Sequence, residues 1–158
     1  MAGDVAVRRR RFLVAGGAAI AASALPAAAQ QRFQPAHDIV PLLQKLTGGK
    51  AAERGGIEVE LPQIAENGNS VPLRIRVASP MTAQDHVSAL HVIAERNPRP
   101  LVASFHLGPQ SGKAEVATRV RLAGTQKVTV LAALSDGGFR VAEVEVLVTS
   151  AACLDESL

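Results

Sequence analysis

Hydrophobic and polar residues alternate along most of the chain beyond residue 56, which is the pattern of β-strands with one buried face. In residues 71–78, valine, leucine and isoleucine at the odd positions alternate with proline, arginine and alanine at the even positions. The pattern predicts strands at 57–61, 71–78, 87–94, 101–107, 114–122, 127–134 and 139–148.

Short segments rich in turn-forming residues separate these predicted strands. Residues 67–69 (Asn-Gly-Asn) accept positive φ in a tight hairpin, 97–100 (Asn-Pro-Arg-Pro) interrupt the next pair, and 136–138 (Asp-Gly-Gly) turn the last one. The gaps are too short for the crossover helices that parallel strands need. We therefore predict an all-β fold, an immunoglobulin-like antiparallel β-sandwich of about seven strands.

A segment whose hydrophobic residues recur with helical periodicity precedes the first predicted strand. Ile39, Leu42, Leu43 and Leu46 recur at the spacing of an amphipathic helix, and two glycines at 48–49 end the segment. We predict one short N-terminal helix.

The first 29 residues have the composition of an export signal. A basic stretch at 8–11 leads into an apolar run at 12–25, and alanines at 27–29 supply the small residues of a cleavage site. Residues 9–13 (Arg-Arg-Arg-Phe-Leu) resemble the twin-arginine consensus, which directs folded proteins across the bacterial inner membrane. A membrane anchor is the alternative, but the run is shorter than the roughly 20 apolar residues of a spanning helix. We expect a mature periplasmic chain that begins at residue 30.

Removal of this leader would change the charge of the protein. The whole chain has a formal net charge of +3, but four arginines and one aspartate lie in the first 29 residues, so the mature chain is formally neutral. Its charge therefore gives no argument for binding to nucleic acid or to a membrane. After cleavage Phe33, Phe105 and Phe139 are the remaining aromatic residues, too few for a platform on which bases stack.

The histidines, His37, His86, His91 and His106, lack the spacing of a metal site. His86 and His91 are five residues apart on one predicted strand, so we expect them to point to opposite faces. We predict structural or surface roles for all four, with no metal ion and no cofactor.

Two pairs of arginines occupy alternate positions on predicted strands. The pairs are Arg74 with Arg76 and Arg119 with Arg121. We expect a solvated face or cross-strand ion pairs with residues such as Glu143 and Glu145. Docking to an acidic partner is the alternative.

Cys153 is the one cysteine of the sequence, and it lies near the C-terminus in the tail formed by residues 150–158. A lone thiol cannot form an intramolecular disulfide, and on a tail it has no preorganised base or oxyanion hole for catalysis. It is an incidental thiol, a site for an intermolecular disulfide, or a reactive carrier thiol. Because free exposed thiols oxidise and crosslink, one is tolerated most easily where it is used.

Several segments spread over the mature chain form a recognisable set. They are Leu-Pro-Gln-Ile-Ala-Glu-Asn-Gly-Asn-Ser-Val-Pro-Leu at 61–73, Ser-Pro-Met-Thr at 79–82, His-Val-Ile-Ala-Glu-Arg-Asn-Pro-Arg-Pro at 91–100, Ser-Gly-Lys-Ala at 111–114, Thr-Arg-Val-Arg-Leu-Ala-Gly-Thr-Gln at 118–126 and Ser-Asp-Gly at 135–137. The set resembles the SoxY family, the sulfur-carrier subunit of the bacterial thiosulfate-oxidising (Sox) system. The resemblance covers nearly the whole mature chain.

The resemblance implies a periplasmic carrier with no catalysis and no cofactor of its own. Members of the family pair with a second immunoglobulin-like subunit, SoxZ, as a heterodimer, and they attach sulfur intermediates covalently to a cysteine on a mobile C-terminal arm. The matching residue here is Cys153. Separate enzymes visit such an arm: a haem protein that joins thiosulfate to the thiol, a hydrolase that releases sulfate and, in some organisms, a sulfane dehydrogenase.

The expected organisation is therefore a twin-arginine signal peptide at 1–29, a sandwich domain with its N-terminal helix at 30–149 and a mobile arm at 150–158. The arm departs from the family's usual ending, Gly-Gly-Cys-Gly-Gly, because alanines stand at 151 and 152 and Leu-Asp-Glu-Ser-Leu follows at 154–158. Alanine and leucine are bulkier and stiffer than glycine. The two acidic residues and the terminal carboxylate are expected to disfavour the thiolate and to repel thiosulfate. The alternative function is a non-catalytic binding module that Cys153 tethers to a partner by a disulfide.

Overall fold

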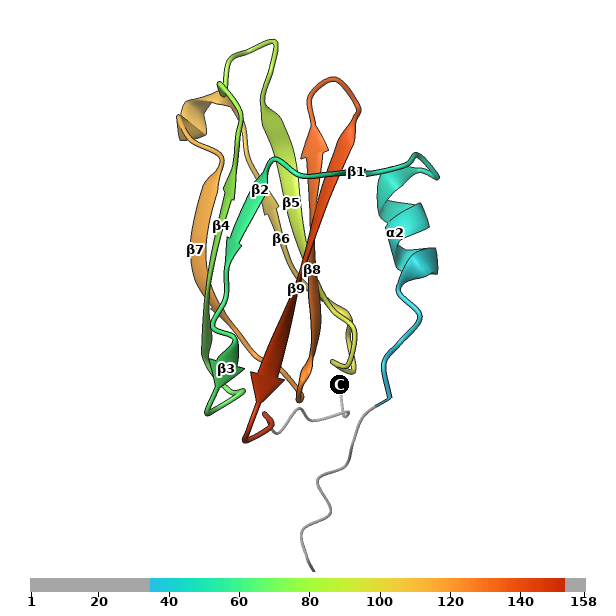
Figure 1. Cartoon of the computed structure of the whole chain (residues 1–158). Helices are drawn as coiled ribbons and strands as arrows, with labels where there is room; N and C mark the ends of the chain where they lie inside the picture. The colour runs from blue at the N-terminus through green and yellow to red at the C-terminus, as the bar shows by residue number, and fades with distance from the viewer. Residues whose placement is uncertain (1–34, 153–158) are drawn as a thin grey trace, which may run out of the picture. The chain divides into compact units, whose positions relative to one another are not determined.

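The computed structural model describes residues 35–152, which form a helix, α2 (Val40–Thr47), followed by β-strands in two layers (Figure 1). The strands are β1 (Glu53–Arg54), β2 (Ile57–Glu60), β3 (Ile64–Ala65), β4 (Val71–Val77), β5 (Val87–Ala94), β6 (Leu101–His106), β7 (Glu115–Val120), β8 (Gln126–Leu134) and β9 (Phe139–Val148). A short 3-10 helix, η1 (Pro109–Ser111), precedes β7.

The strands form one large and one small sheet. The large sheet has the order β1-β9-β8-β5-β6, with β3 also paired to β9, and the small sheet has the order β2-β4-β7. Neighbouring long strands are antiparallel, whereas the short β1 and β3 run parallel to β9. The prediction of an all-β, immunoglobulin-like sandwich with a short N-terminal helix is confirmed.

All seven predicted strands occur, as β2 and β4 to β9, with ends that differ by at most two residues. The additional strands β1 and β3 have two residues each, which is too short for an alternating pattern.

The core lies between the two sheets. The small sheet contributes Leu73 and Ile75, and the large sheet contributes side chains such as Val92 and Val130, all at most 2% exposed. They pack together because alternate residues of a strand point to the same face. Replacing Ile75 by alanine would cost about 2–5 kcal/mol of unfolding free energy, the usual range for deletion of a core aliphatic side chain.

The helix α2 lies on the side of the large sheet that faces away from the small sheet (Figure 1). Gly48 ends it at φ 62°, and the Gly49 amide donates to the Gln44 carbonyl at 2.9 Å. On this side of the sheet Ile93 and Leu131 are fully buried although they lie outside the core between the sheets. Before the helix, the His37 amide donates to the Glu95 carbonyl at 2.7 Å.

Candidate functional site at the C-terminal end of the sandwich

The predicted site residue, Cys153, lies outside the described residues, which end at Ala152. The structure therefore describes the chain up to the residue that precedes the thiol. That segment leaves β9 at the end of the sandwich that also holds β3 (Figure 1).

The β3 segment guides the chain as it leaves β9. The Leu147 amide donates to the Gln63 carbonyl at 2.9 Å, and the Thr149 amide donates to the Ala65 carbonyl at 3.0 Å. The Thr149 hydroxyl donates to the Glu66 carbonyl at 3.0 Å. These bonds continue the parallel pairing of β3 with β9 and fix the direction in which the chain leaves the sheet.

Beyond Thr149, backbone groups of Gly68 and Leu122 hold the last described residues. The Gly68 amide donates to the Ser150 carbonyl at 2.7 Å, and the Ala152 amide donates to the Leu122 carbonyl at 3.1 Å. The Leu122 amide in turn donates to the Gly68 carbonyl at 2.8 Å, which ties the two sides together. We call these backbone groups of Gly68, Leu122, Ser150 and Ala152 the C-terminal clamp.

The clamp requires glycine at position 68. A Cβ atom there would overlap the carbonyl oxygen of Leu122 and would lie 2.9 Å from the amide nitrogen of Ala152 and 3.0 Å from Cγ1 of Val148. The sequence predicted a different role for this residue, namely positive φ in a tight hairpin. That role is wrong, because Gly68 is not among the residues with positive φ, and β3 lies between the two strands that the hairpin was to join.

Asn97 and Gln126 fix the loop that carries Leu122. Both are buried, at 5% and 4% exposure. The Asn97 side-chain amide donates to the Arg121 carbonyl at 2.8 Å, and its oxygen accepts from the Ala123 amide at 2.9 Å and from Gln126 Nε2 at 3.0 Å. Gln126 Nε2 also donates to the Gly124 carbonyl at 3.2 Å. Because the residues on both sides of Leu122 are bonded to Asn97, the carbonyl of Leu122 is held facing Ala152.

The surface beside the clamp is partly apolar. Ile64 and Leu147 are neighbours in the pairing of β3 with β9, and they are 62% and 48% exposed. A shallow groove, lined by residues that include Gln63, Thr125 and Leu147, opens on the same part of the surface.

The predicted arm of residues 150–158 thus begins with residues that are bonded to the sandwich. Ser150 and Ala152 take part in the clamp, and Ala152 is 8% exposed. Residues 153–158 lie outside the described part of the chain, so the extent of a mobile arm stays a prediction.

His86 and His91 have separate hydrogen-bond partners. His86 lies just before β5 rather than in it and contacts the Thr82 carbonyl through Nδ1 at 3.1 Å, whereas Nδ1 of His91 lies 2.8 Å from the Ser104 hydroxyl. Burial lowers the pKa of His91, and the charge of the nearby His106 lowers it further. Within residues 35–152, no group of three histidine, cysteine, aspartate or glutamate side chains is placed to hold a metal ion.

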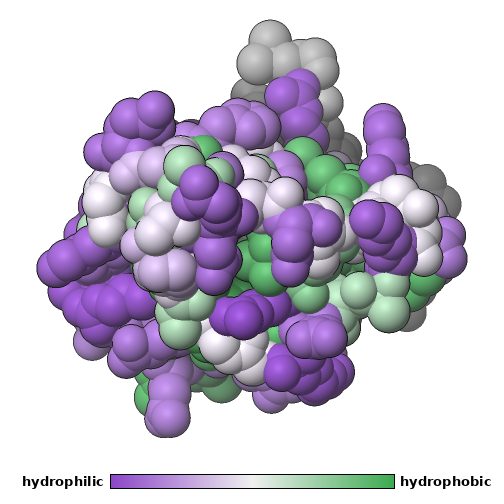
Figure 2. Space-filling view, turned by 90° about the horizontal axis from the view of Figure 1, so that it is seen from above, coloured by the Kyte–Doolittle hydropathy of each residue, from purple (hydrophilic) through white to green (hydrophobic). Residues whose placement is uncertain are grey.

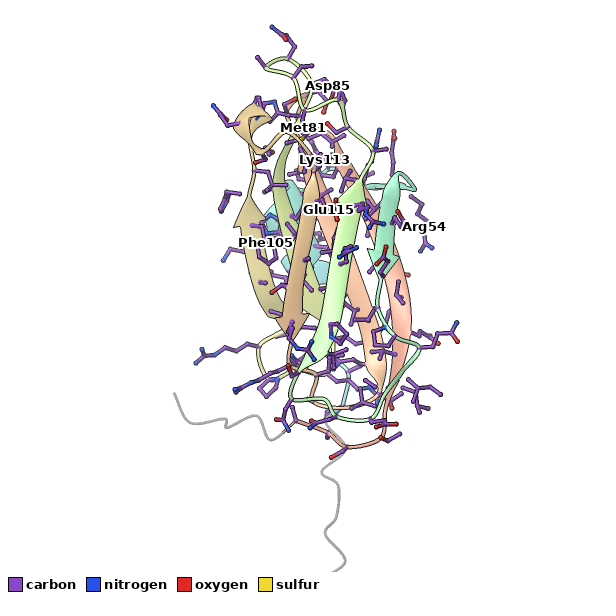
Figure 3. All side chains as sticks on the ribbon, turned by 90° about the vertical axis from the view of Figure 1, so that its left-hand side faces the viewer. Arg54, Met81, Asp85, Phe105, Lys113 and Glu115 are labelled. Carbon is purple, nitrogen blue, oxygen red and sulfur yellow. The ribbon has the colours of Figure 1, made fainter. Side chains whose placement is uncertain are left out.

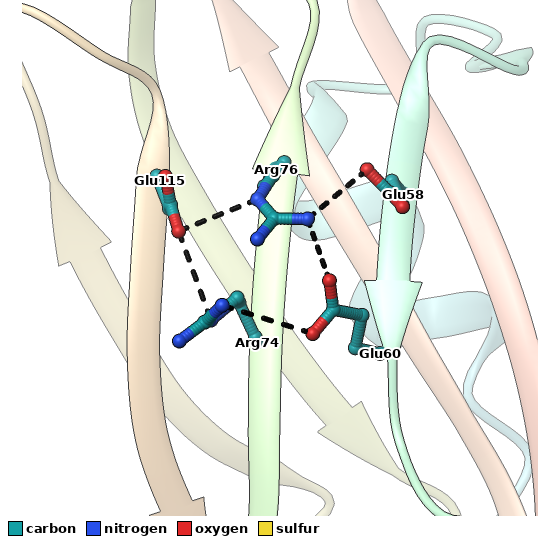
Figure 4. A network of polar contacts seen from close by, with 5 residues as sticks. All are labelled: Glu58, Glu60, Arg74, Arg76 and Glu115. Carbon is teal, nitrogen blue, oxygen red and sulfur yellow. Dashed lines mark hydrogen bonds and ion pairs between the residues drawn. The ribbon is translucent and has the colours of Figure 1, made fainter.

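The predicted partners of Arg74 and Arg76 were wrong. The two arginines form ion pairs on the small sheet with glutamates of both neighbouring strands, not with Glu143 and Glu145, which belong to β9 of the other sheet (Figure 4). The glutamates are Glu58, Glu60 and Glu115.

Arg76 has the shortest of these contacts, 2.5 Å between its Nη1 and Oε1 of Glu60. Burial lowers the pKa of Arg76, but the carboxylates of Glu60 and Glu115 raise it above its usual value overall. In the other pair, Arg119 donates to the hydroxyl and the carbonyl of Ser70. These contacts give both arginines of β4 and Arg119 structural partners within the domain.

The opposite end of the sandwich carries Met81, Asp85 and Lys113 (Figure 3). Met81 is 5% exposed and has a φ of 51°. Its amide donates to the Ser79 hydroxyl at 3.2 Å, and its side chain belongs to the buried core. Hydrophilic side chains surround smaller apolar areas here (Figure 2). None of the described helices is long and apolar enough to cross a membrane.

The clamp was not predicted from the sequence, although Gly68 and Leu122, and the side chains that fix the Leu122 loop, lie in segments that carried the family resemblance. Residues 61–73 supply β3 and Gly68, residues 91–100 supply Asn97, and residues 118–126 supply Leu122 and Gln126. The signal that could have pointed to the clamp was the joint occurrence of these three segments in one chain. The contacts between them are visible only in the folded structure.

A known protein family matches the part of the chain that contains the clamp. The family model, described as sulfur oxidation protein SoxY, matches residues 43–153. The match begins within α2, includes both sheets and the clamp, and ends at Cys153. The predicted resemblance to this family is confirmed.

Solved structures include a similar protein of the same description. The sulfur carrier protein SoxY from Chlorobium limicola f thiosulfatophilum has a TM-score of 0.58 and 29% sequence identity, over 69% of this chain and 94% of that chain. Superoxide reductase (neelaredoxin) from Ignicoccus hospitalis has a TM-score of 0.54 and 15% identity, over 60% and 80% of the two chains. At that identity the likeness shows the fold alone. Curated proteins gave no sequence match.

Proposed function

Because this chain belongs to the SoxY family of sulfur oxidation proteins, we propose that it is a carrier that binds sulfur intermediates covalently through Cys153 during thiosulfate oxidation. Family membership and the similar SoxY structure support a sulfur-carrier role in sulfur oxidation. The observation that carries the attachment site is the family match, which extends to Cys153, the single thiol of the chain.

The proposed reaction begins when a haem enzyme joins thiosulfate to the thiol. The cysteine S–H bond breaks and an S–S bond forms to the outer sulfur atom of thiosulfate; one proton leaves, and two electrons would leave one at a time through the haem enzyme to an electron acceptor. A hydrolase then uses water to cleave the sulfonate group as sulfate, and the outer sulfur atom stays on Cys153. A sulfane dehydrogenase is the proposed third visitor. The carrier itself supplies no acid, base or redox group in this scheme.

The proposal includes location and assembly. The leader at 1–29 directs the folded chain to the periplasm by the twin-arginine route, and a SoxZ-like subunit forms a heterodimer with the sandwich. The exposed pair Ile64 and Leu147, beside the clamp, gives visiting enzymes an apolar surface near the end of the described chain. Purification of the native protein as a monomer at near-native salt, with no second subunit, would contradict the heterodimer.

Intact mass spectrometry of protein purified from periplasm without reductant tests the function. We expect masses increased by sulfur, sulfonate or thiosulfate groups, all of them absent from the Cys153→Ser variant. The variant should keep the same melting temperature, since the change is confined to the end of the chain. A disulfide-linked dimer with no sulfur adduct would instead favour the tethered binding module. A large fall in the melting temperature of Cys153→Ser would mark the cysteine as a structural residue and contradict the carrier.

A further inference from the structure

In residues 35–152, three of the four edges of the two sheets are protected against pairing with another strand. The open side of β9 is covered by the short parallel strands β1 and β3. In the small sheet, β2 carries Glu58 and Glu60 and β7 carries Glu115 and Arg119, all of them exposed. Charged side chains and covered edges are the usual means by which proteins keep their sheets from associating.

The fourth edge, β6, has neither a cover nor a charge among the described residues. Its sequence, Leu-Val-Ala-Ser-Phe-His at 101–106, contains no aspartate, glutamate, lysine, arginine or proline, and its one strand neighbour there is β5. A bulge disturbs the pairing near Leu101 and leaves residues 103–106 in regular register. Figure 3 shows β6, marked by Phe105, at the margin of the molecule. An uncharged edge of this kind is a template for another strand.

The hydrogen bonds of β6 show which of its backbone groups face outward. The Leu107 amide donates to the Ser88 carbonyl at 3.0 Å, so Leu107 bonds toward β5. Residues of an antiparallel edge strand face the neighbour and the open side alternately, so the amides and carbonyls of Ser104 and His106 face away from β5. An added strand would complete these bonds, whereas a helix uses its backbone groups internally.

The side chains of β6 define what the added strand must carry on its two faces. Ala103 and Phe105 pack against the core between the sheets. Ser104 lies opposite His91 and contacts its Nδ1 at 2.8 Å on the outer face. Because side chains of neighbouring strands lie beside one another, the added strand continues the core only if it is apolar on the face beside Phe105.

The ionisable residues around β6 are all basic. Between residues 95 and 115 the sequence has no acidic residue, and its ionisable residues there are Arg96, Arg99, His106 and Lys113. A second copy of this chain would bring the same basic segment to the edge, and like charges would oppose the pairing. Charge complementarity therefore favours a different partner, with acidic residues on both sides of an uncharged strand.

We propose that β6 is the site at which a second polypeptide adds a strand to the large sheet. This strand is uncharged at its centre, apolar on the face that continues the core, and flanked by acidic residues. The inference rests on the heterodimer of the proposed function and names the surface through which it forms. Because β6 lies at the opposite edge of the large sheet from β9, a partner there leaves Ile64 and Leu147 open to visiting enzymes.

Proline at position 104 blocks this pairing with little change to the sandwich. Ser104→Pro removes an outward amide and no hydrogen bond to β5. Ser104→Ala is the control at the same position, because it loses the hydroxyl contact with His91 and keeps the amide.

Ala117→Pro is the matched control on β7, an edge that charged residues protect. The Val77 amide donates to the Ala114 carbonyl at 2.9 Å, so by the same alternation the Ala117 amide faces the open side of the small sheet. The substitution thus places proline at an outward amide of the other sheet.

The readout is the affinity for the second subunit that purifies with the natural chain from periplasm at near-native salt. Sedimentation measures the dissociation constant of the full mature chain and of each variant recombined with that subunit. We expect Ser104→Pro to raise the constant at least about tenfold, and Ser104→Ala and Ala117→Pro to change it less than about twofold. High salt should weaken the natural complex, because it screens the acidic flanks from the basic segment, and an affinity independent of salt would overturn those flanks.

Hydrogen exchange locates the contact. The amides of Ser104 and His106 should exchange at least about tenfold more slowly in the complex than in the isolated chain, whereas the Ala117 amide should not change. Core amides of β8 should stay protected in Ser104→Pro. If that variant does not fold, Ser104→Lys replaces it, because it keeps the amide and places a charge on the uncharged edge.

The possible outcomes separate this inference from the proposed function. Unchanged affinity of Ser104→Pro, or unchanged exchange of Ser104 and His106 in the complex, would overturn the assignment of β6 and leave the heterodimer standing. A homodimer that protects the same amides would overturn the acidic partner. A chain that purifies only as a monomer would overturn the heterodimer and the β6 site together, while sulfur adducts on Cys153 would still support the carrier.

Discussion

Replacement of Asn97 by alanine should destabilise the domain and loosen the clamp together. The side chain makes three hydrogen bonds, of 2.8, 2.9 and 3.0 Å, to Arg121, Ala123 and Gln126, and it is 5% exposed. Each bond contributes about 1 kcal/mol net, and the partners would be left without it in a site that water enters poorly. We therefore expect a loss of about 3 kcal/mol in unfolding free energy, or a fall of about 10–15 °C in the melting temperature of a domain of this size.

Urea unfolding and a thermal melt of the mature chain measure the effect. Asn69→Ala is the control, because Asn69 is exposed and its side chain donates to that of Asn67 at the surface. It should change stability by less than about 0.5 kcal/mol. Asn97→Ala should also speed hydrogen exchange of the Ala152 amide under native conditions, since the Leu122 carbonyl that accepts from it loses its support. A stability loss below about 1 kcal/mol would refute the role assigned to Asn97.

Three further outcomes are expected. Thr129 is 1% exposed and its hydroxyl has no hydrogen-bond partner, so Thr129→Val should raise the unfolding free energy by about 1 kcal/mol in urea titrations, and a decrease would contradict this. The folded-state pKa of His91 lies below its unfolded value, so its contribution to stability is complete above about pH 6.5 and is lost as pH falls below that value. His91→Gln should flatten this part of the stability profile, and an unchanged profile would contradict the assignment. Rebuilding residues 151–155 as Gly-Gly-Cys-Gly-Gly should raise turnover by enzymes of a glycine-arm system, and equal turnover of the natural chain at low salt would refute both the steric and the charge argument for its ending.

The strands were predictable because the information for them is local. In β4 every second residue is buried, at Val71, Leu73, Ile75 and Val77, and this burial follows from the sequence pattern alone. The helix α2 was predictable for the same reason, since its period and its terminal glycines lie within a dozen residues. The strands β1 and β3 were not, because two residues have no period and form a strand only where β9 is available as a partner.

Contacts between segments that are distant in the chain could not be predicted from the sequence pattern. Arg76 was given the wrong glutamate partners because alternation predicts which residues share a face and leaves open which strands are neighbours. Gly68 was assigned to a turn because a glycine beside two asparagines is typical of one. What requires a glycine at this position is the close approach of two backbone groups, the Leu122 carbonyl and the Ala152 amide. Both belong to segments far from Gly68 in the sequence.

The clamp also changes the interpretation of the unusual arm. Alanine at 152 was expected to act through its bulk and stiffness, but in the fold this residue is buried against its own domain. Burying its methyl group favours the clamped arrangement by about 0.8 kcal/mol, and the lower chain entropy of alanine compared with glycine in an unbound segment adds about 0.4–1 kcal/mol. Together these effects favour the clamp contacts of residue 152 about tenfold over a glycine at the same position. Part of the gain expected from the glycine ending therefore arises in the carrier and not in the enzyme. Because that part involves no charge, high salt should leave it unchanged, whereas it should weaken the repulsion caused by Asp155 and Glu156.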